Sequence, residues 1–422
     1  MMIRRDFVDG GTMADAATTK QVPTDVNDLS LAFLRQVLES HFGRDTALLL
    51  RSFSTERVGE KDGFLGAIYR VSLHWEKGVT RGGLPDSLIA KFALADSSGE
   101  VFEQFFKPLH IFEREASFYS SFLHSEAFNV FRRFAPCCYC ALWDTPSGRG
   151  VLLMEDIRSG ALRSFRQGLD IPATKLALRA LASLHALHWC SPSPSASTSS
   201  PSSPFPWLLL PHSAPFPELI SGLTRESIKS LKSALGQENT NKTTVLSEQT
   251  WKKLEQLAED VPIIFAEKVE EVKAICHGDL WSSNLLCSLA SSLEREERIT
   301  LIDFQFVQWS NPMQDVAFFL YSSLPCHLLN TQVQDLLAFY HDQVNNFLVS
   351  DGKHNYAWED CQRDFEKAKR RALIQALAGV DVFLMATATA SPEQLDDEPQ
   401  SLPEPLSRIF HLIGDLVATG QL

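Results

Sequence analysis

The segment ICHGDLWSSNLL, residues 275–286, sets three polar side chains at short fixed spacings inside an apolar frame. Apolar residues bound the stretch that holds His277, Asp279 and Asn284 on both sides, and the Asp and the Asn are five positions apart. Polar groups in such a setting must be paired with hydrogen-bonding partners or must serve chemistry. The segment is therefore the first candidate for part of a functional site.

Three further polar residues stand in apolar surroundings elsewhere in the chain. The stretch ITLIDFQF, 299–306, leads through apolar residues to Asp303. Lys91 lies among Ile, Ala and Phe in a predicted strand, DSLIAKFAL. Glu115 falls on the apolar stripe of a helix that we expect to begin at about Pro108. An acid on the inward face of a helix needs a cationic partner.

Together these residues are the minimal set for moving a phosphoryl group from ATP. That reaction requires positioning and charge neutralisation more than covalent catalysis. A Lys can hold the α- and β-phosphates and an inward Glu can hold that Lys, while Asp and Asn oxygens suit Mg²⁺. A further Asp can orient the acceptor hydroxyl and take its proton. Each residue alone has a simpler explanation: a snorkelling Lys, a surface Glu or an Asp that caps a turn.

The pattern along the chain divides it into two parts. Strand-like runs surround one helix up to about residue 157, and helical patterns follow. We predict a mobile head at 1–28, an N-terminal lobe at 29–157 and a C-terminal lobe at 158–422. A Ser/Pro-rich insertion at about 191–206 cannot bury a core.

Composition narrows the class of protein. The chain has 422 residues and a formal net charge of −13, which disfavours nucleic acid and anionic membranes as partners. No apolar run approaches a membrane span, and the first residues lack the apolar core of a signal peptide, so we expect a cytoplasmic protein. Three of the eight cysteines crowd into CCYC (137–140), where no further metal ligands are nearby, and all eight are expected to be reduced thiols. No protein partner is indicated.

HGDLWSSNLL followed by LIDFQF resembles the kinase-like phosphotransferases, the group with aminoglycoside phosphotransferases and choline kinases. In particular, HGDxWxxN, IDFQ and a later Asp in DVAFFL (315–320) resemble the ecdysteroid-kinase-like (CHK-type) family. LIAKF, FEREASFY and LLMEDI extend the resemblance to about residues 45–390. It implies an α+β, two-lobed protein-kinase-like fold, in which a small lobe with an antiparallel sheet and one helix precedes a larger, mainly helical lobe.

The resemblance also implies roles for single residues. Asp279 resembles the catalytic base, and Asn284 and Asp303 resemble the Mg²⁺ ligands. Lys91 and Glu115 resemble the ion pair that anchors ATP.

Other positions receive supporting roles from the same resemblance. Glu155, Asp156 and Ile157 fall where the segment between the lobes meets the adenine, mostly through its backbone. Asp315 resembles a structural Asp that braces the catalytic loop, and His277 is expected to hydrogen-bond within that loop.

Some features depart from a protein kinase. Only twelve positions separate Asp303 from Asp315, which leaves no room for a peptide-docking segment, so the acceptor is expected to be a small molecule. The nucleotide loop GEKDGFLG is not GxGxxG, although the amides of Gly63 and Gly66 are candidates to cover the phosphates.

The leading hypothesis is an ATP- and Mg²⁺-dependent kinase that phosphorylates a hydroxyl of a small molecule, and the resemblance permits a steroid-like or other lipophilic alcohol. The altered nucleotide loop motivates an alternative, a nucleotide-binding pseudokinase or scaffold. A choline- or aminoglycoside-type kinase with a cationic acceptor is a further alternative.

Overall fold

The structure of the chain is a computed structural model that describes residues 22–58, 66–77, 83–93, 107–124, 128–144, 148–158, 160–162, 167–191, 202–237, 246–266, 272–288, 298–380 and 403–422. Within these ranges, none of the helices combines the length and the apolar character needed to cross a membrane.

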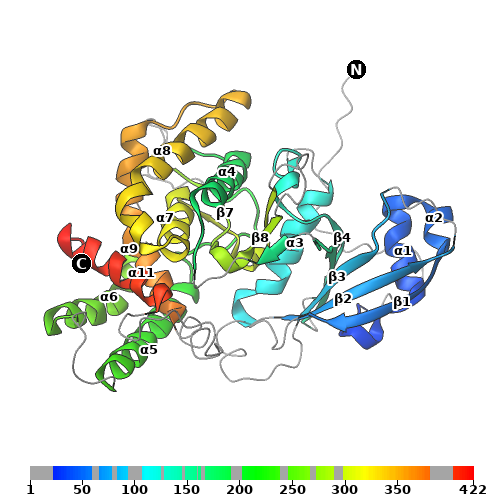
Figure 1. The fold of residues 1–422 in the computed structure, drawn as a ribbon, viewed down its shortest axis with the longest axis horizontal. Coiled ribbons are helices and arrows are strands. Elements are labelled where there is room, and N and C mark those ends of the chain that lie inside the picture. Colours follow the sequence, from blue (N-terminus) through cyan, green and yellow to red (C-terminus); the bar gives the residue numbers. More distant parts are fainter. Residues whose placement is uncertain are drawn as a thin grey trace.

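The N-terminal part is built on one five-stranded antiparallel sheet with the spatial order β1-β2-β3-β5-β4 (Figure 1). All five strands were predicted from the sequence. They are β1 (Leu50–Arg57), β2 (Gly66–Trp75), β3 (Ser87–Ala93), β4 (Cys138–Asp144) and β5 (Arg149–Glu155).

The two faces of this sheet pack against different helices. Leu88, Ala90 and Phe92 of β3 belong to a core cluster that also contains buried residues of α1 (Leu31–Phe42). Because side chains alternate along a strand, Lys91 lies on the opposite face, which α3 (Ile111–His124) covers. On that face the Lys91 side chain can contact residues of α3 and of the C-terminal part.

The helix α3 begins later than the sequence suggested. Lys107–Leu109 form a short 3₁₀ helix, and His110 adopts a left-handed backbone conformation with φ of 49°. A residue at positive φ interrupts a right-handed helix, so Pro108 does not start α3. The predicted start was therefore wrong by three positions, although Glu115 does lie on the inward face.

The C-terminal part is mainly helical, as Figure 1 shows on the side opposite the sheet. Its helices are α4 (Ile171–Leu187), α5 (Phe216–Gln237), α6 (Glu248–Ala266), α7 (Pro312–Ser323), α8 (Cys326–Ser350), α9 (Trp358–Ala378) and α11 (Glu404–Ala418). This arrangement of a small antiparallel lobe and a larger helical lobe confirms the predicted fold class. The exact lobe boundaries stay a prediction.

Short strands bring the two motif segments together. β7 (Ala274–Cys276) pairs with β10 (Gln308–Ser310), and β8 (Leu285–Ser288) pairs with β9 (Arg298–Leu301), both antiparallel. The loop from β7 to β8 therefore lies beside the loop from β9 to β10. These two loops carry the polar residues singled out in the sequence.

All eight cysteines are described and all are free thiols. Cys138 packs in the core cluster on the α3 side, whereas Cys140 packs against the cluster on the α1 side. A register shift in β4 between these two residues explains why they face different sides.

Candidate active site

Lys91 lies between two carboxylates that come from different parts of the chain. Its Nζ donates to Glu115 Oε2 and to Asp303 Oδ1, at 2.7 Å in each case. Burial alone would lower the pKa of Lys91, but the charges of Asp303 and Glu115 outweigh it and raise the pKa. The lysine is therefore a firmly charged ammonium that joins β3, α3 and the segment after β9. The predicted Lys–Glu pair is present.

Asp303 reaches this position through an unusual backbone conformation. Its φ of 68° and ψ of 63° are left-handed, which few residues other than Gly adopt. The next residue, Phe304, is fully buried and stacks on Phe118 of α3 with the ring centroids 4.1 Å apart. Anchoring of this ring holds the turn, and Gln305 Nε2 donates to Asp303 Oδ2 at 3.2 Å.

The segment that follows β7 holds the other two predicted site residues. Asn284 Nδ2 donates to the backbone oxygen of Asp279 at 2.8 Å and lies 3.4 Å from Asp279 Oδ2. Burial raises the pKa of Asp279 well above its ordinary value, and the nearby Asp303 carboxylate adds to this effect. The two Asp residues and Asn284 thus form one oxygen-rich group beside Lys91.

Asp315 explains why the loop keeps its shape. Its buried carboxylate on α7 accepts hydrogen bonds from the backbone N–H groups of His277 at 2.6 Å and Gly278 at 2.9 Å. Gly278 has φ of 82°, and a Cβ there would lie 2.1 Å from the backbone oxygen of Phe306. Only glycine fits at position 278. The loop conformation therefore requires both Gly278 and the Asp315 carboxylate. His185 Nε2 also contacts the Asp315 carboxylate, at 3.1 Å.

His277 serves the loop as a neutral ring. Its Nε2 lies 3.0 Å from the backbone oxygen of Ile302, which can only accept, so Nε2 carries the proton. Its Nδ1 then accepts from the backbone N–H of Asp279 at 3.3 Å. Burial lowers the pKa of His277. The ring hydrogen-bonds within the loop, as predicted.

Sequence reasoning missed a residue that touches this loop from far along the chain. Gln375 on α9 donates from Nε2 to the backbone oxygen of Gly278 at 2.8 Å, and the same nitrogen lies 3.5 Å from Asp279 Oδ1. A single Gln in a long helical pattern carries no signal of such a role. The contact appears only when α9 is packed beside the loop.

The segment after β5 is also held by side chains that the sequence did not single out. Asp156 accepts from Arg70 Nε of β2 at 2.7 Å, from Ser87 Oγ of β3, and from Arg158 Nε at 3.1 Å. Glu155 Oε2 accepts from the backbone N–H of Cys137 at 3.1 Å. Both acidic side chains are therefore used to fix the segment itself.

Of the two glycines predicted for the nucleotide loop, the structure describes only Gly66. Gly66 is the first residue of β2, where it pairs with Ala93 of β3. Gly63 lies outside the described residues.

Solved structures with a similar arrangement include small-molecule kinases. A choline kinase from Cryptosporidium parvum Iowa II is 12% identical with a TM-score of 0.46, over 93% of this chain and 96% of that one. An ethanolamine kinase from Plasmodium vivax is 10% identical with a TM-score of 0.43, over 93% of this chain and 90% of that one. A search of curated protein sequences found no significant match.

The model of the ecdysteroid kinase-like family matches residues 60–350, which is well over half of the chain. The matched range contains Lys91, Glu115, Asp279, Asn284 and Asp303. The resemblance seen in the motifs is therefore confirmed: the chain belongs to the ecdysteroid kinase-like family and is a small-molecule kinase.

Proposed function

We propose that this kinase uses ATP and Mg²⁺ to phosphorylate a hydroxyl of a small, lipophilic alcohol of the steroid type. The observation that carries the proposal is the buried Lys91 ammonium, held at 2.7 Å from both Glu115 and Asp303, beside the Asp279 and Asn284 loop. This combination supplies a cation for phosphates and oxygen ligands for a metal in one place. The steroid-type acceptor is supported by the family's name.

The nucleotide side of the site would use three groups of residues. Lys91, oriented by Glu115, binds the α- and β-phosphates. The backbone of residues 155–157 contacts the adenine, which is consistent with the use of the Glu155 and Asp156 side chains inside the protein. The amides near Gly63 and Gly66 cover the phosphates.

The donor set fits a hard divalent cation such as Mg²⁺. The Asn284 amide nitrogen is engaged with the Asp279 backbone, which leaves its carbonyl oxygen as the ligand atom. Asp303 contributes carboxylate oxygens, and two carboxylates near one another favour a cation. We assign Asn284 and Asp303 as the ligands of the ion, which when bound neutralises charge on the transferred phosphoryl group.

Asp279 is the proposed general base. It orients the acceptor hydroxyl and takes its proton as the oxygen attacks the γ-phosphorus and the β–γ bridging bond breaks. Asp315, Gly278 and Gln375 hold the loop that presents this carboxylate.

The test is mass spectrometry of a metabolite extract incubated with Mg-ATP and the purified protein, run in parallel with Asp279→Asn. A matched control is Asp335→Asn, because Asp335 is exposed on α8. We expect one phosphorylated alcohol with the wild type and the control but not with Asp279→Asn. A phosphorylated choline- or aminoglycoside-like product would overturn the lipophilic acceptor. Binding of Mg-ATP without any phosphorylated product, in this extract and in a panel of sterols, would indicate the pseudokinase instead.

A further inference from the structure

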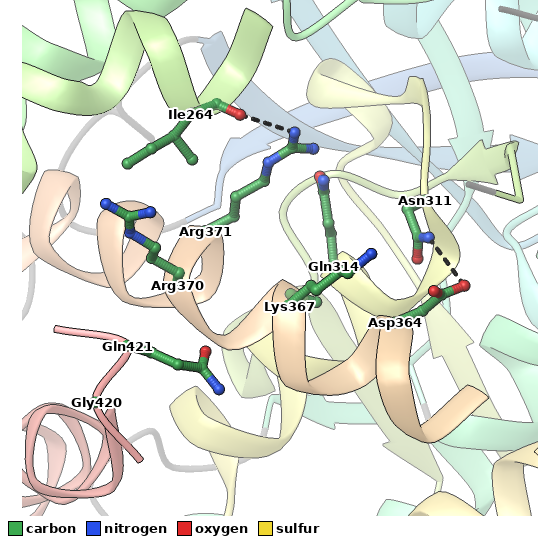
Figure 2. A pocket seen from close by; sticks show the side chains of 10 residues that line it. Ile264, Asn311, Gln314, Asp364, Lys367, Arg370, Arg371, Gly420 and Gln421 are labelled. Carbon is green, nitrogen blue, oxygen red and sulfur yellow. Dashed lines mark hydrogen bonds between the residues drawn. The ribbon is translucent and has the colours of Figure 1, made fainter. Parts of the chain in front are cut away.

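A cavity of about 390 Å³ lies in the helical part of the protein, and nothing in the proposed reaction uses it. Figure 2 shows its walls: charged side chains of α9, the end of α6, the start of α7 and the residues that follow α11. This volume suits a small organic molecule rather than a single ion.

The side chains around the cavity present hydrogen-bond donors. Gln314 is only 8% exposed, and its Oε1 accepts from Ser310 Oγ at 2.8 Å. Among the described residues its Nε2 has no partner, although the side chain lines the cavity. Arg370 Nε is likewise buried without a hydrogen-bond acceptor in the described part of the chain. A ligand that supplies acceptor oxygens would satisfy both groups.

The charges at the cavity favour an anion. Lys367, Arg370 and Arg371 all line it. Asp364, also in the lining, lies 3.2 Å from Arg363, which it shares with Asp360 at 2.5 Å. Two further groups offset part of this positive charge.

Asp260 of α6 lies 3.8 Å from Arg370. Arg371 donates to the backbone oxygen of Ile264 at 2.9 Å, at the carboxyl end of α6. With Asp260, Asp360, Arg363 and Asp364 all counted, the cluster keeps an excess of one positive charge in a protein whose net charge is −13. Such a local reversal of charge is typical of an anion site.

We propose that this cavity binds an organic anion, that is, a carboxylate, sulfate or sulfonate carried on a small apolar body. Gln314, Arg370 and Lys367 would donate to the anionic oxygens. Ile264 and Ala368 supply apolar wall for the rest of the ligand. The inference goes beyond the kinase reaction and does not depend on it.

The position of the cavity links it to the catalytic loop. Arg371 and Gln375 are four residues apart on α9, so they lie on one face, about 6 Å apart along the axis. Gln375 donates to the backbone oxygen of Gly278. An anion bound beside Arg371 in the middle of α9 is thus one helical turn from a residue that holds the loop.

The test is isothermal titration calorimetry of the full chain with naphthalene-2-sulfonate, compared with the uncharged 2-naphthol and with inorganic sulfate. We expect saturable one-to-one binding of the sulfonate and at least about tenfold weaker binding of the other two. Gln314→Glu should weaken sulfonate binding at least about tenfold, because it replaces a donor with a like charge. Gln36→Glu, on the exposed surface of α1, is the matched control and should bind as the wild type does.

A second variant, Lys367→Met, tests the proposal even if Gln314→Glu fails to fold. Lys367 is exposed, so Lys367→Met should leave the fold intact and still weaken binding several-fold. Lys91→Met removes the ammonium of the nucleotide cleft and should leave sulfonate binding unchanged. Equal binding by wild type, Gln314→Glu and Lys367→Met would overturn the proposal. The proposal would also be overturned if Lys91→Met were the one variant that abolished sulfonate binding. An affinity for 2-naphthol equal to that for the sulfonate would overturn it as well.

Discussion

The carboxylate of Asp279 is held in a state that costs stability. Burial and the neighbouring Asp303 both raise its pKa, so the charged form is disfavoured in the folded protein. Asp279→Asn keeps the shape and removes this repulsion. We expect kcat to fall by about three orders of magnitude, within the range of general-base catalysis, while the melting temperature stays equal or rises. Steady-state kinetics and thermal unfolding of the same preparation measure both.

Asp335→Asn, on the exposed face of α8, should change neither quantity. If Asp279→Asn retained more than about a tenth of the wild-type kcat, Asp279 would not be the general base.

Gln375 acts through the loop rather than on the substrate. Its amide holds the backbone oxygen of Gly278 and approaches Asp279 Oδ1. Gln375→Met keeps the length of the side chain but loses both contacts. A displaced base lowers the rate of the chemical step, so we expect a ten- to hundredfold lower kcat (order of magnitude) with an unchanged KM for ATP.

The matched control is Gln362→Met, which is exposed on the same helix. A purely structural role of Gln375 would instead lower the melting temperature and leave kcat per folded molecule as in the wild type.

At the scale of elements, Lys91 ties β3, α3 and the segment after β9 into one unit. Lys91→Met leaves the buried Glu115 without its cation, which we expect to cost about 3 kcal/mol of unfolding free energy. Adding Glu115→Leu removes the unpaired acid, so stability should return towards that of the wild type while activity stays absent. Denaturant unfolding and turnover assays separate these effects. If the double variant were no more stable than Lys91→Met, the pair would not be the cause of the loss.

Asp156 plays a similar part for β2, β3 and the segment after β5. Burial tends to raise its pKa, but hydrogen bonds from Arg70, Ser87 and Arg158 outweigh burial and hold the pKa below its ordinary 3.8. Because the folded pKa is lowered, the stabilisation is fully present above pH 3.8 and is lost as the pH falls through the folded value.

Urea unfolding of wild type and Asp156→Asn between pH 6 and pH 3 should show this. The difference in unfolding free energy is expected to stay constant down to about pH 5 and to shrink below about pH 4. A difference that grows on acidification would contradict the assigned direction.

The sequence predicted the strands and the reacting residues because these depend on short-range patterns. Lys91, Glu115 and Asp303 were each exceptions to a local apolar pattern, and together they fit one reaction. Gln375 and Arg70 were not predictable, because each is ordinary for its helix or strand and its partner lies 97 or 86 residues away. The late start of α3 depends on the backbone of His110, which no local pattern marked.

At the scale of the whole molecule, the five-stranded sheet belongs to two cores. Along β5, Val151 and Leu153 pack with the α1 cluster, whereas Leu152 and Met154 pack with the cluster that continues through the helical part. Because successive side chains of β5 point to opposite faces of the sheet, this one strand packs into both cores and connects the two lobes. A substitution that loosens the packing of one core therefore also affects β5, against which the other core packs.

This shared sheet predicts that the two lobes unfold together. Leu34 on α1 and Leu373 on α9 are both fully buried, but they lie in different clusters. We expect Leu34→Ala and Leu373→Ala each to cost about 3 kcal/mol and to shift the same single calorimetric transition. The calorimetric and van't Hoff enthalpies should stay equal in both variants. Two resolved transitions in Leu34→Ala, with only the first displaced, would mean that the α1 layer melts by itself, and the sheet would then be a boundary between lobes rather than their common core.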